Sequence, residues 1–340
     1  MNAASAPGAI ELRELVDLAT SPLVEAVSPF GEAPYVVVYL DAASPRPGAK
    51  EEAAIVGWLR RQSGPVMAVA EGGAHERLQQ ACDLSVDNAA TLGPLIENIR
   101  RSPLAAMVLV QVLRATEQLP IEQALVVESL AYATLQGGAE FRRWLDARPA
   151  RSRPRATDPG PPVVVERNGA NLEIRLNRPS RRNSMSVEMR DGLCEALQLV
   201  AADPSIDTAR VSGLGQCFSS GGDLDEFGTA PDTATAHAVR SLRLPASVLL
   251  QCVERVEFRL HGACVGAGAE LPAFGRRVHA TPDAFFQLPE IRLGLIPGAG
   301  GCVSIPRRIG RQRMAYMALS SARIDAPQAL AWGLVDAIGE

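Results

Sequence analysis

A run of prolines and arginines near the middle of the chain sets the strongest limit on how this sequence can fold. Residues 148–162, RPARSRPRATDPGPP, hold five prolines and four arginines in 15 positions. Proline fixes φ and has no backbone N–H, so this segment cannot extend a helix or join a strand ladder. It predicts an extended linker between two parts of a 340-residue chain, a length typical of two domains.

The part before the linker is predicted to be mostly helical. Residues 104–114 and 121–136 carry apolar side chains at helical spacing, and two glycines stop the second run. The short apolar runs at 35–40 and 66–69 indicate buried strands. We therefore expect a leader over residues 1–30 and a mostly helical unit over residues 31–147.

After the linker, strands and helices alternate. Asn168-Gly169 is a strong hairpin signal between two apolar runs, and Ser186 is a plausible cap for a helix over 187–201. Strands are expected at 163–165, 172–176, 209–212 and 256–260. This alternation predicts an α/β or mixed spiral domain over residues 163–340.

Composition excludes several classes of protein. A net charge of −4 and a pI near 5.7 argue against a nucleic-acid partner. Six cysteines without a CxxC pair and four scattered histidines predict neither a metal site nor a disulfide framework. The sequence has no signal peptide and no apolar run near the roughly 20 residues that span a bilayer. We expect a cytoplasmic protein with reduced thiols and no membrane partner.

Three segments rich in small residues are candidates for chemistry: CFSSGGDL at 217–224, HGACVGAGAE at 261–270, and FQLPE at 286–290 followed by GLIPGAGG. Small residues expose backbone N–H groups, and a helix starting near Ala267 would aim its unpaired donors at a ligand. Two such donors from separate loops can form an oxyanion hole. Glu270 and Glu290 would then be a carboxylate pair suited to acid–base work.

Each segment taken alone has a simpler explanation. GAGAE can be tight strand–helix packing, and PGAGG lacks the lysine of a phosphate-binding loop. His261 is better explained as a turn or core residue than as a base. Asp223 and Asp225 are typical of loop-capping carboxylates.

Together, in their order and spacing, the segments resemble the crotonase (enoyl-CoA hydratase/isomerase) family from about residue 163 onward. The matching motifs are LNRPSRRNSMS at 176–186, CFSSGGDLDEF at 217–227, HGACVGAGAEL at 261–271, FFQLPEIRLGLIPGAGG at 285–301 and SSARIDAPQALAWGLVDAI at 320–338. The resemblance implies an α/β fold, the ββα spiral of that family.

The resemblance also implies a site. Family members bind acyl-CoA thioesters, and their oxyanion donors match the backbone N–H groups of Gly222 and Ala267. Glu270 matches the glutamate that holds or activates water, and Glu290 the one that exchanges the proton at Cα. The residues expected to contact substrate or CoA are Arg181, Arg182, Ser220, Gly221, Asp223, Leu224, Gly266 and Gly298. No metal and no cofactor beyond the thioester's own coenzyme A are implied, and homo-oligomers (trimers or hexamers) are typical.

The architecture departs from the family in one respect. The sequence stops where the family's closing helices would begin, and residues 102–151 resemble those helices, placed upstream instead. Residues 65–86 resemble a shortened strand–turn–helix copy without its glutamate. We expect a degenerate, catalytically empty crotonase-like half whose helices pack on the second half and complete it. The alternative is an unrelated helical appendage.

Two glutamates favour hydration or dehydration of an enoyl-CoA, because an isomerase needs only one base to move a proton. Isomerisation is the second choice. Decarboxylation, hydrolysis or C–C cleavage of an acyl-CoA on the same site stays open, and so does a non-catalytic CoA-binding subunit. The acyl group itself is not predicted.

Overall fold

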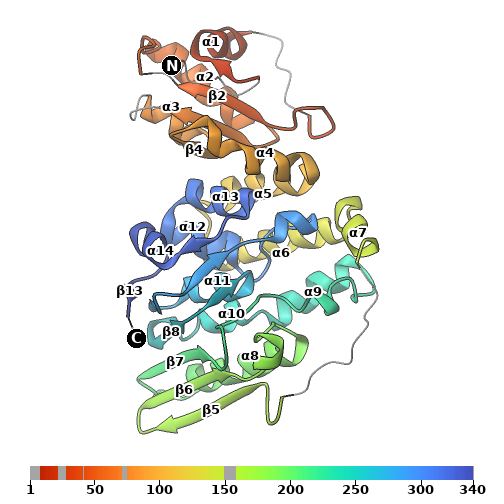
Figure 1. Ribbon diagram of the computed structural model, residues 1–340, viewed down its shortest axis with the longest axis vertical. Coiled ribbons are helices and arrows are strands. Elements are labelled where there is room, and N and C mark those ends of the chain that lie inside the picture. The colour runs from red at the N-terminus through yellow and green to blue at the C-terminus, as the bar shows by residue number, and fades with distance from the viewer. Residues whose placement is uncertain (1–7, 22–27, 41, 71–74, 149–157, 340) are drawn as a thin grey trace.

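The computed structural model describes residues 8–21, 28–40, 42–70, 75–148 and 158–339. Most of the linker expected over 148–162 lies outside these residues. A small sheet with its helices forms one end of the molecule, a second and larger sheet forms the other end, and a layer of helices lies between them (Figure 1).

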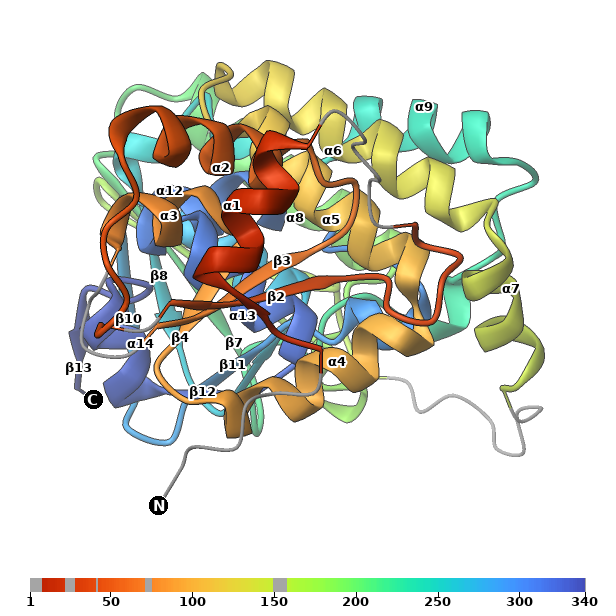
Figure 2. The same ribbon diagram turned by 90° about the horizontal axis from the view of Figure 1, so that it is seen from above.

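The small sheet has four parallel strands in sequence order. Its elements are β1 (Ile10–Glu11), α1 (Leu12–Thr20), β2 (Val36–Leu40), α2 (Ala49–Arg61), β3 (Val66–Ala70), α3 (Glu76–Ala81) and β4 (Leu84–Val86). Side chains of β2 and β3 alternate between two cores: Val36 and Val38 face α1 and α2, whereas Val37 and Met67 face the rest of the molecule. Helices cover one face of this sheet in the view from above (Figure 2). Burial on both faces explains why β2 and β3 read as continuous apolar runs.

This sheet corrects two expectations from the sequence. Residues 1–30, expected to be a leader, include β1 and α1, and α1 buries Leu12 and Leu15 in the core of the small sheet. The described residues before the linker also include four strands, of which only β2 and β3 were expected. β1 and β4 have two and three residues, too few to show an alternating pattern.

Four helices follow the small sheet: α4 (Leu92–Arg101), α5 (Pro103–Thr116), α6 (Ile121–Gln136) and α7 (Ala139–Asp146). The helices expected at 104–114 and 121–136 are confirmed as α5 and α6. Both are apolar on the side that faces the core, and α6 buries Ala124, Leu125 and Tyr132 there.

The second part of the chain builds a six-stranded sheet in the order β13-β10-β8-β7-β6-β5 and a three-stranded sheet in the order β12-β11-β9. The strands are β5 (Val163–Asn168), β6 (Asn171–Leu176), β7 (Thr208–Gly213), β8 (Val256–Leu260), β9 (Ala263–Val265), β10 (Arg277–Ala280), β11 (Phe285–Gln287), β12 (Ile324–Asp325) and β13 (Ala337–Ile338). The β5–β6 hairpin turns at Gly169, whose φ is +59°. This confirms the hairpin expected at Asn168-Gly169.

The helices of this part are α8 (Val187–Ala202), α9 (Thr233–Arg243), α10 (Pro245–Leu249), α11 (Ala267–Glu270), α12 (Gly301–Ile309), α13 (Arg311–Ser320) and α14 (Ala326–Trp332). Ser186 caps α8 as expected, because its hydroxyl accepts a hydrogen bond from the backbone N–H of Met189.

One apolar core joins the two parts of the chain. It runs from Val37 and Met67 of the small sheet through α5 and α6 to α12 and α13. Polar contacts cross the same boundary: the Asn98 amide donates to the backbone carbonyls of Leu319 and Ser320, and Arg311 pairs with the buried Asp83 at 3.1 Å. The expected α/β fold, with an N-terminal half that packs on the spiral domain, is confirmed.

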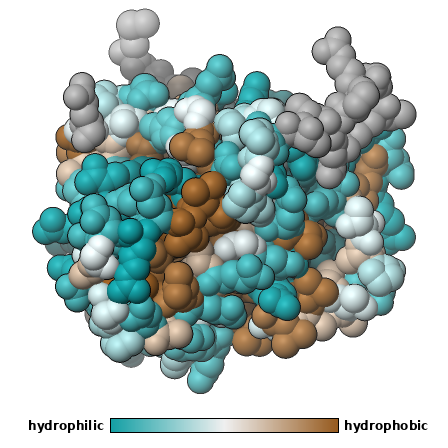
Figure 3. All heavy atoms as spheres, turned by 90° about the horizontal axis from the view of Figure 1, so that it is seen from below, coloured by the Kyte–Doolittle hydropathy of each residue, from teal (hydrophilic) through white to brown (hydrophobic). Residues whose placement is uncertain are grey.

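The face seen from below, at the end formed by the larger sheet and α8, carries a hollowed apolar band between hydrophilic areas (Figure 3). Exposed apolar side chains on elements at this end include Val165, Val187 and Leu199. Within the described ranges, no helix is both long and apolar enough to cross a membrane.

Candidate active site

Three chain segments meet because short strands pair side by side. β11 runs parallel to β9, with Gln287 opposite Val265, and Ser219 forms a parallel bridge to Cys264 of β9. Parallel neighbours end at the same edge of a sheet, so the residues that follow each strand lie close together. This edge brings together the loop at 219–223, the turn into α11, and Glu290.

Gly221 and Gly266 allow two of these segments to touch. Both have positive φ, +86° and +50°, which other residues rarely adopt. A Cβ on Gly221 would lie 2.7 Å from the carbonyl oxygen of Val265 and 3.5 Å from the Cα of Gly266. The two loops are therefore in backbone contact, and only glycine fits there.

The next residue in each loop presents a free backbone donor. Neither the N–H of Gly222 nor that of Ala267 donates a hydrogen bond within the described part of the chain. Ala267 is the first residue of α11, where an N–H has no partner inside the helix. It is absent from the residues with positive φ, so its methyl group causes no backbone strain. The two donors expected from the sequence thus lie on adjoining loops, as an oxyanion hole requires.

Glu270, at the end of α11, is buried at 2% exposure. Its Oε2 accepts hydrogen bonds from the backbone N–H groups of Ala299 at 2.7 Å and Gly301 at 2.9 Å. Burial raises the pKa of Glu270 to about 7, although these two bonds favour the ionised form. No hydrogen bond engages Oε1 among the described residues, so one oxygen of this carboxylate is left for a ligand.

Glu290 follows β11 and lies against the turn into α11. A Cβ on Gly266 would be only 2.6 Å from its Oε1, and its buried Oε2 has no hydrogen-bond partner in the described residues. Burial, followed by the charge of Glu270, raises the pKa of Glu290 well above its ordinary value. Burial therefore favours the protonated form of the Glu290 carboxyl, which lies against Gly266.

Glu128 of α6 is a third buried carboxyl, and it comes from the N-terminal half. It accepts hydrogen bonds from the backbone N–H groups of Gly300 at 2.7 Å and Cys302 at 2.8 Å. Along residues 299–302, the backbone N–H groups thus donate alternately to Glu270 and to Glu128. Burial and the charge of Glu270 raise the pKa of Glu128.

One helical turn beyond Glu128, Tyr132 packs on Gly298, where a Cβ would meet its ring at 2.2 Å. The guanidinium of Arg240, on α9, lies over the same ring at 4.3 Å from the centroid. We had expected the N-terminal half to contribute no residue to the site. Instead, α6 places Glu128 and Tyr132 against the turn beside Glu270.

Six of the expected CoA-contact residues lie in the loop around Gly222 or against it, whereas Gly266 is in the turn into α11 and Gly298 packs against Tyr132. Arg181 is ion-paired with the buried Asp223, which also caps the turn that follows through the backbone N–H of Asp225. Arg182 is exposed, and its carbonyl accepts the N–H of Ser220 at 2.9 Å. The side chain of Leu224 is 45% exposed. Of the two arginines, only Arg182 presents an exposed side chain toward solvent.

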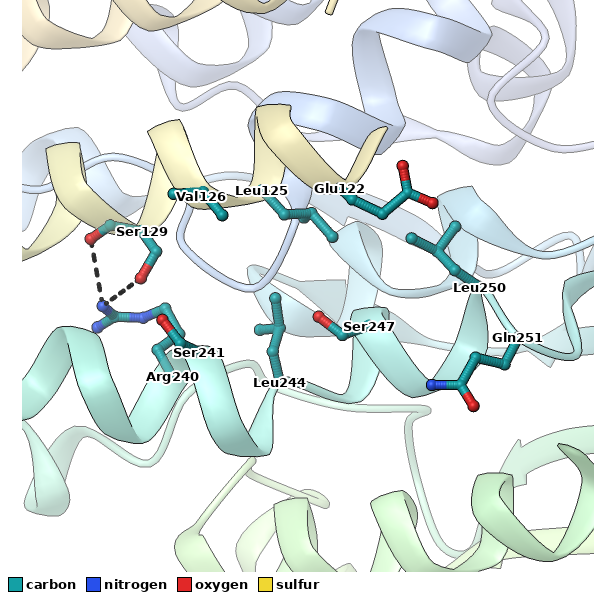
Figure 4. Close-up of a pocket in the computed structure, with 10 residues that line it drawn as sticks. All are labelled: Glu122, Leu125, Val126, Ser129, Arg240, Ser241, Leu244, Ser247, Leu250 and Gln251. Carbon is teal, nitrogen blue, oxygen red and sulfur yellow. Dashed lines mark hydrogen bonds between the residues drawn. The ribbon is translucent and has the colours of Figure 1, made fainter. Parts of the chain in front are cut away.

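Two cavities lie near the site, although Gly222, Ala267, Glu270 and Glu290 are not among the residues that line them. The first, of about 360 Å³, is lined by Met185, Asp223 and Phe227 beside Gly222 and by Tyr132 and Arg240. The second, of about 380 Å³, lies between α6 above and α9 with α10 below (Figure 4). Arg240 lines both cavities and so stands between them.

Sequence reasoning missed Glu128, Tyr132 and Arg240. A signal for the first was present: Glu128 interrupts an otherwise apolar helix face that includes Leu125, Tyr132 and Leu135. An acidic residue on the buried face of a helix needs a specific partner. Arg240 gave no such signal, since α9 is polar on most of its surface.

The fold is an α/β fold in which buried carboxyls lie beyond the ends of short parallel strands. A sequence profile described as enoyl-CoA hydratase/isomerase matches residues 166–339, just over half of the chain. The chain belongs to the enoyl-CoA hydratase/isomerase family, the crotonases.

Characterised relatives include both reaction types. The chain is 35% identical over 178 residues to 2,3-dehydroadipyl-CoA hydratase of Escherichia coli, covering 51% of this chain and 67% of the relative. It is 36% identical over 176 residues to 1,2-epoxyphenylacetyl-CoA isomerase of the same organism, covering 48% and 64%. It is 33% identical over 181 residues to cyclohexa-1,5-dienecarbonyl-CoA hydratase of Thauera aromatica, covering 52% and 67%. The matched segment spans about two thirds of these relatives or less.

Among solved structures, a putative enoyl-CoA hydratase/isomerase from Mycobacterium abscessus is similar, with a TM-score of 0.50 and 31% identity. The match covers 52% of this chain and 70% of that chain. It confirms the expected spiral fold in the second part of the chain.

Proposed function

We propose that this protein adds water to, or removes it from, the double bond of an enoyl-CoA thioester. The observation that carries the proposal is the placement of two buried carboxyls, Glu270 and Glu290, next to two free backbone donors on adjoining loops. The donors at Gly222 and Ala267 would bind the thioester oxygen and stabilise the enolate that forms when Cβ is attacked.

Different surroundings give the two carboxyls different tasks. Glu270 is held by two backbone N–H groups and its pKa lies near 7, so much of it is ionised at neutral pH and can accept a proton from water. The buried Oε2 of Glu290 has no hydrogen-bond partner among the described residues, and burial favours the protonated form, whose proton Glu290 can give to Cα. Environments that separate two carboxyl pKa values in this way are typical of acid–base pairs.

Isomerisation of a double bond is the second candidate, because Glu290 alone can move a proton between carbon atoms beside the same donors. Both reactions need only carboxyls and the oxyanion donors, and we assign no cofactor beyond the coenzyme A of the substrate. Arg182, exposed beside Ser220, is the arginine we assign to the CoA phosphates. We further propose that the protein is cytoplasmic and assembles as a homo-oligomer, a trimer or hexamer.

Replacing Glu270 with Gln tests hydration against isomerisation. A Gln cannot take a proton from water, so Glu270→Gln is expected to abolish hydration. Exchange of the Cα proton with solvent deuterium, which the ionised form of Glu290 catalyses, should continue and should be faster at high pH. Hydration is followed at the enoyl absorbance band and exchange by mass spectrometry of a saturated acyl-CoA. Full hydration by the variant excludes the role given to Glu270, and equal loss of both reactions indicates that the carboxyls act as one unit.

The oxyanion hole is tested at Ala267. Ala267→Pro removes the N–H and is expected to raise the barrier by about 3–4 kcal/mol, as loss of a hole donor does. Proline is well tolerated at the first position of a helix, so the fold should survive. Ala267→Gly keeps the donor and is expected to cost about 1 kcal/mol or less of stability. Similar kcat/KM values for the two variants would show that this N–H does not bind the thioester.

A further inference from the structure

Arg240 differs from the other charged side chains around the cavity beside Gly222. Those side chains already have partners: Asp223 with Arg181, Arg190 with Asp191, and Glu226 with the backbone N–H of Val187 at 2.7 Å. Arg240 forms no ion pair within the described residues, although it reaches into both cavities.

The hydrogen bonds of Arg240 are long and go to neutral acceptors. Its Nη1 lies 3.5 Å from the carbonyl and 3.4 Å from the hydroxyl of Ser129 (Figure 4). Its Nη2 lies 3.2 Å from the side-chain oxygen of Gln136. Charge-assisted bonds are usually 2.7–2.9 Å. Stacking on Tyr132 fixes the plane of the guanidinium, so its donors are oriented without being fully used.

The positive charge of Arg240 is also destabilised by its partly buried position. Burial lowers the pKa of Arg240, and Glu128 and Glu270 attract it without contacting it. A partly buried cation with no contacting anion is stabilised when a ligand brings one. A guanidinium matches the paired oxygens of a carboxylate or a phosphate, and of these two groups a carboxylate is the one that the end of an acyl chain can carry.

The position of Arg240 indicates which part of a substrate it would meet. With the thioester oxygen at the N–H groups of Gly222 and Ala267, the acyl chain has the adjoining cavity available, which is walled by apolar side chains such as Met185 and Phe227. Arg240 forms part of that wall and separates the cavity from the second one, between α6 and α10.

Building on the proposed function, we propose that Arg240 binds a carboxylate at the far end of the acyl chain. The substrates are then CoA thioesters of dicarboxylic acids. The apolar wall holds the methylene groups, and the guanidinium selects for the terminal charge.

The test compares paired 2-enoyl-CoA substrates of equal chain length, ending in a carboxylate or in a methyl group, over a series of lengths. The wild type is expected to prefer the carboxylate by about 30-fold or more in kcat/KM at the best length, the lower end of what a buried charge pair contributes. Arg240→Gln should remove that preference. Arg243→Gln is the matched control, because Arg243 lies on the same helix but is exposed and lines neither cavity.

Two outcomes overturn the proposal. A wild type that uses both substrates equally well shows that no terminal charge is recognised. Equal loss on both substrates in Arg240→Gln shows that the arginine only balances the charge of Glu128 and Glu270. If neither substrate reacts, the proposed function fails, and calorimetric Kd values of saturated dicarboxyl and monocarboxyl acyl-CoAs still decide whether Arg240 selects the carboxylate.

Discussion

Glu290→Gln is expected to lower kcat for hydration by about 10²–10⁴-fold, the usual effect of removing a positioned acid–base group. The Glu290 carboxyl lies against Gly266 and has a buried oxygen with no hydrogen bond, so it can give its proton to Cα. Gln has nearly the same shape but no acidic proton to transfer to Cα, so binding of the acyl-CoA should persist while turnover falls. Turnover at the wild-type rate would remove Glu290 from the mechanism.

The pH profile gives an independent check of the same assignment. Hydration needs Glu270 ionised, so kcat/KM should rise with pH around 7, the pKa of Glu270. It should fall again at higher pH as Glu290, whose pKa is raised, loses its proton. In Glu290→Gln the fall at high pH should vanish from the residual activity while the rise near 7 remains.

The same substitution should not destabilise the fold. Above about pH 4.5, the ordinary value, an unfolded chain loses the Glu290 proton that the folded chain keeps. The unfolded state then binds fewer protons, so the free energy of unfolding falls as pH rises toward the folded pKa. A Gln side chain does not titrate, so it makes no contribution to this pH dependence. The free energy of unfolding, measured by denaturant titration at pH 5 and pH 8, should fall less between these two pH values for Glu290→Gln than for the wild type.

The residues of the site that the sequence predicted all belong to local motifs. Gly222, Ala267 and Glu270 stand next to glycine turns at strand ends, and Glu290 follows β11 in the segment QLPE. The pairing of β9 with β11, which the sequence did not predict, brings these segments to one edge. The chemistry of these positions depends on backbone N–H groups and nearby carboxyls, which a short segment of sequence specifies.

The rest of the site depends on which helix packs where, so the sequence could indicate only that Glu128, on an apolar helix face, needs a buried partner. Glu128 and Tyr132 belong to a regular apolar helix, and their role arises only from the contact of α6 with the turn at 298–302. In the sequence, Arg240 is indistinguishable from the other charged residues of a surface helix. In the structure, it stacks on Tyr132 and lines two cavities.

The N-terminal part of the chain is expected to be required for activity. Without residues 1–155, the N–H groups of Gly300 and Cys302 lose Glu128, and each unsatisfied buried group costs about 1–3 kcal/mol. The faces of α12 and α13 that contact α5 and α6 would also be exposed to water. A 163–340 fragment should be aggregated or inactive, and adding residues 1–155 as a separate chain should restore part of the activity.

A cleavage control separates loss of the site from loss of the covalent link. A full-length chain carrying a protease site between residues 148 and 158, cut after folding, should keep its activity, because the core and the contacts of Glu128 are non-covalent.

A substitution tests the contact of Glu128 directly. Glu128→Ala in the intact chain should lower kcat about tenfold or more, since the N–H groups of Gly300 and Cys302 lose their acceptor and no longer fix the turn that holds Glu270. Gln123→Ala, at an exposed position on the same helix that lines neither cavity, should leave kcat unchanged within about twofold, as surface substitutions usually do. A soluble and fully active 163–340 fragment would instead show that the N-terminal helices are an independent appendage.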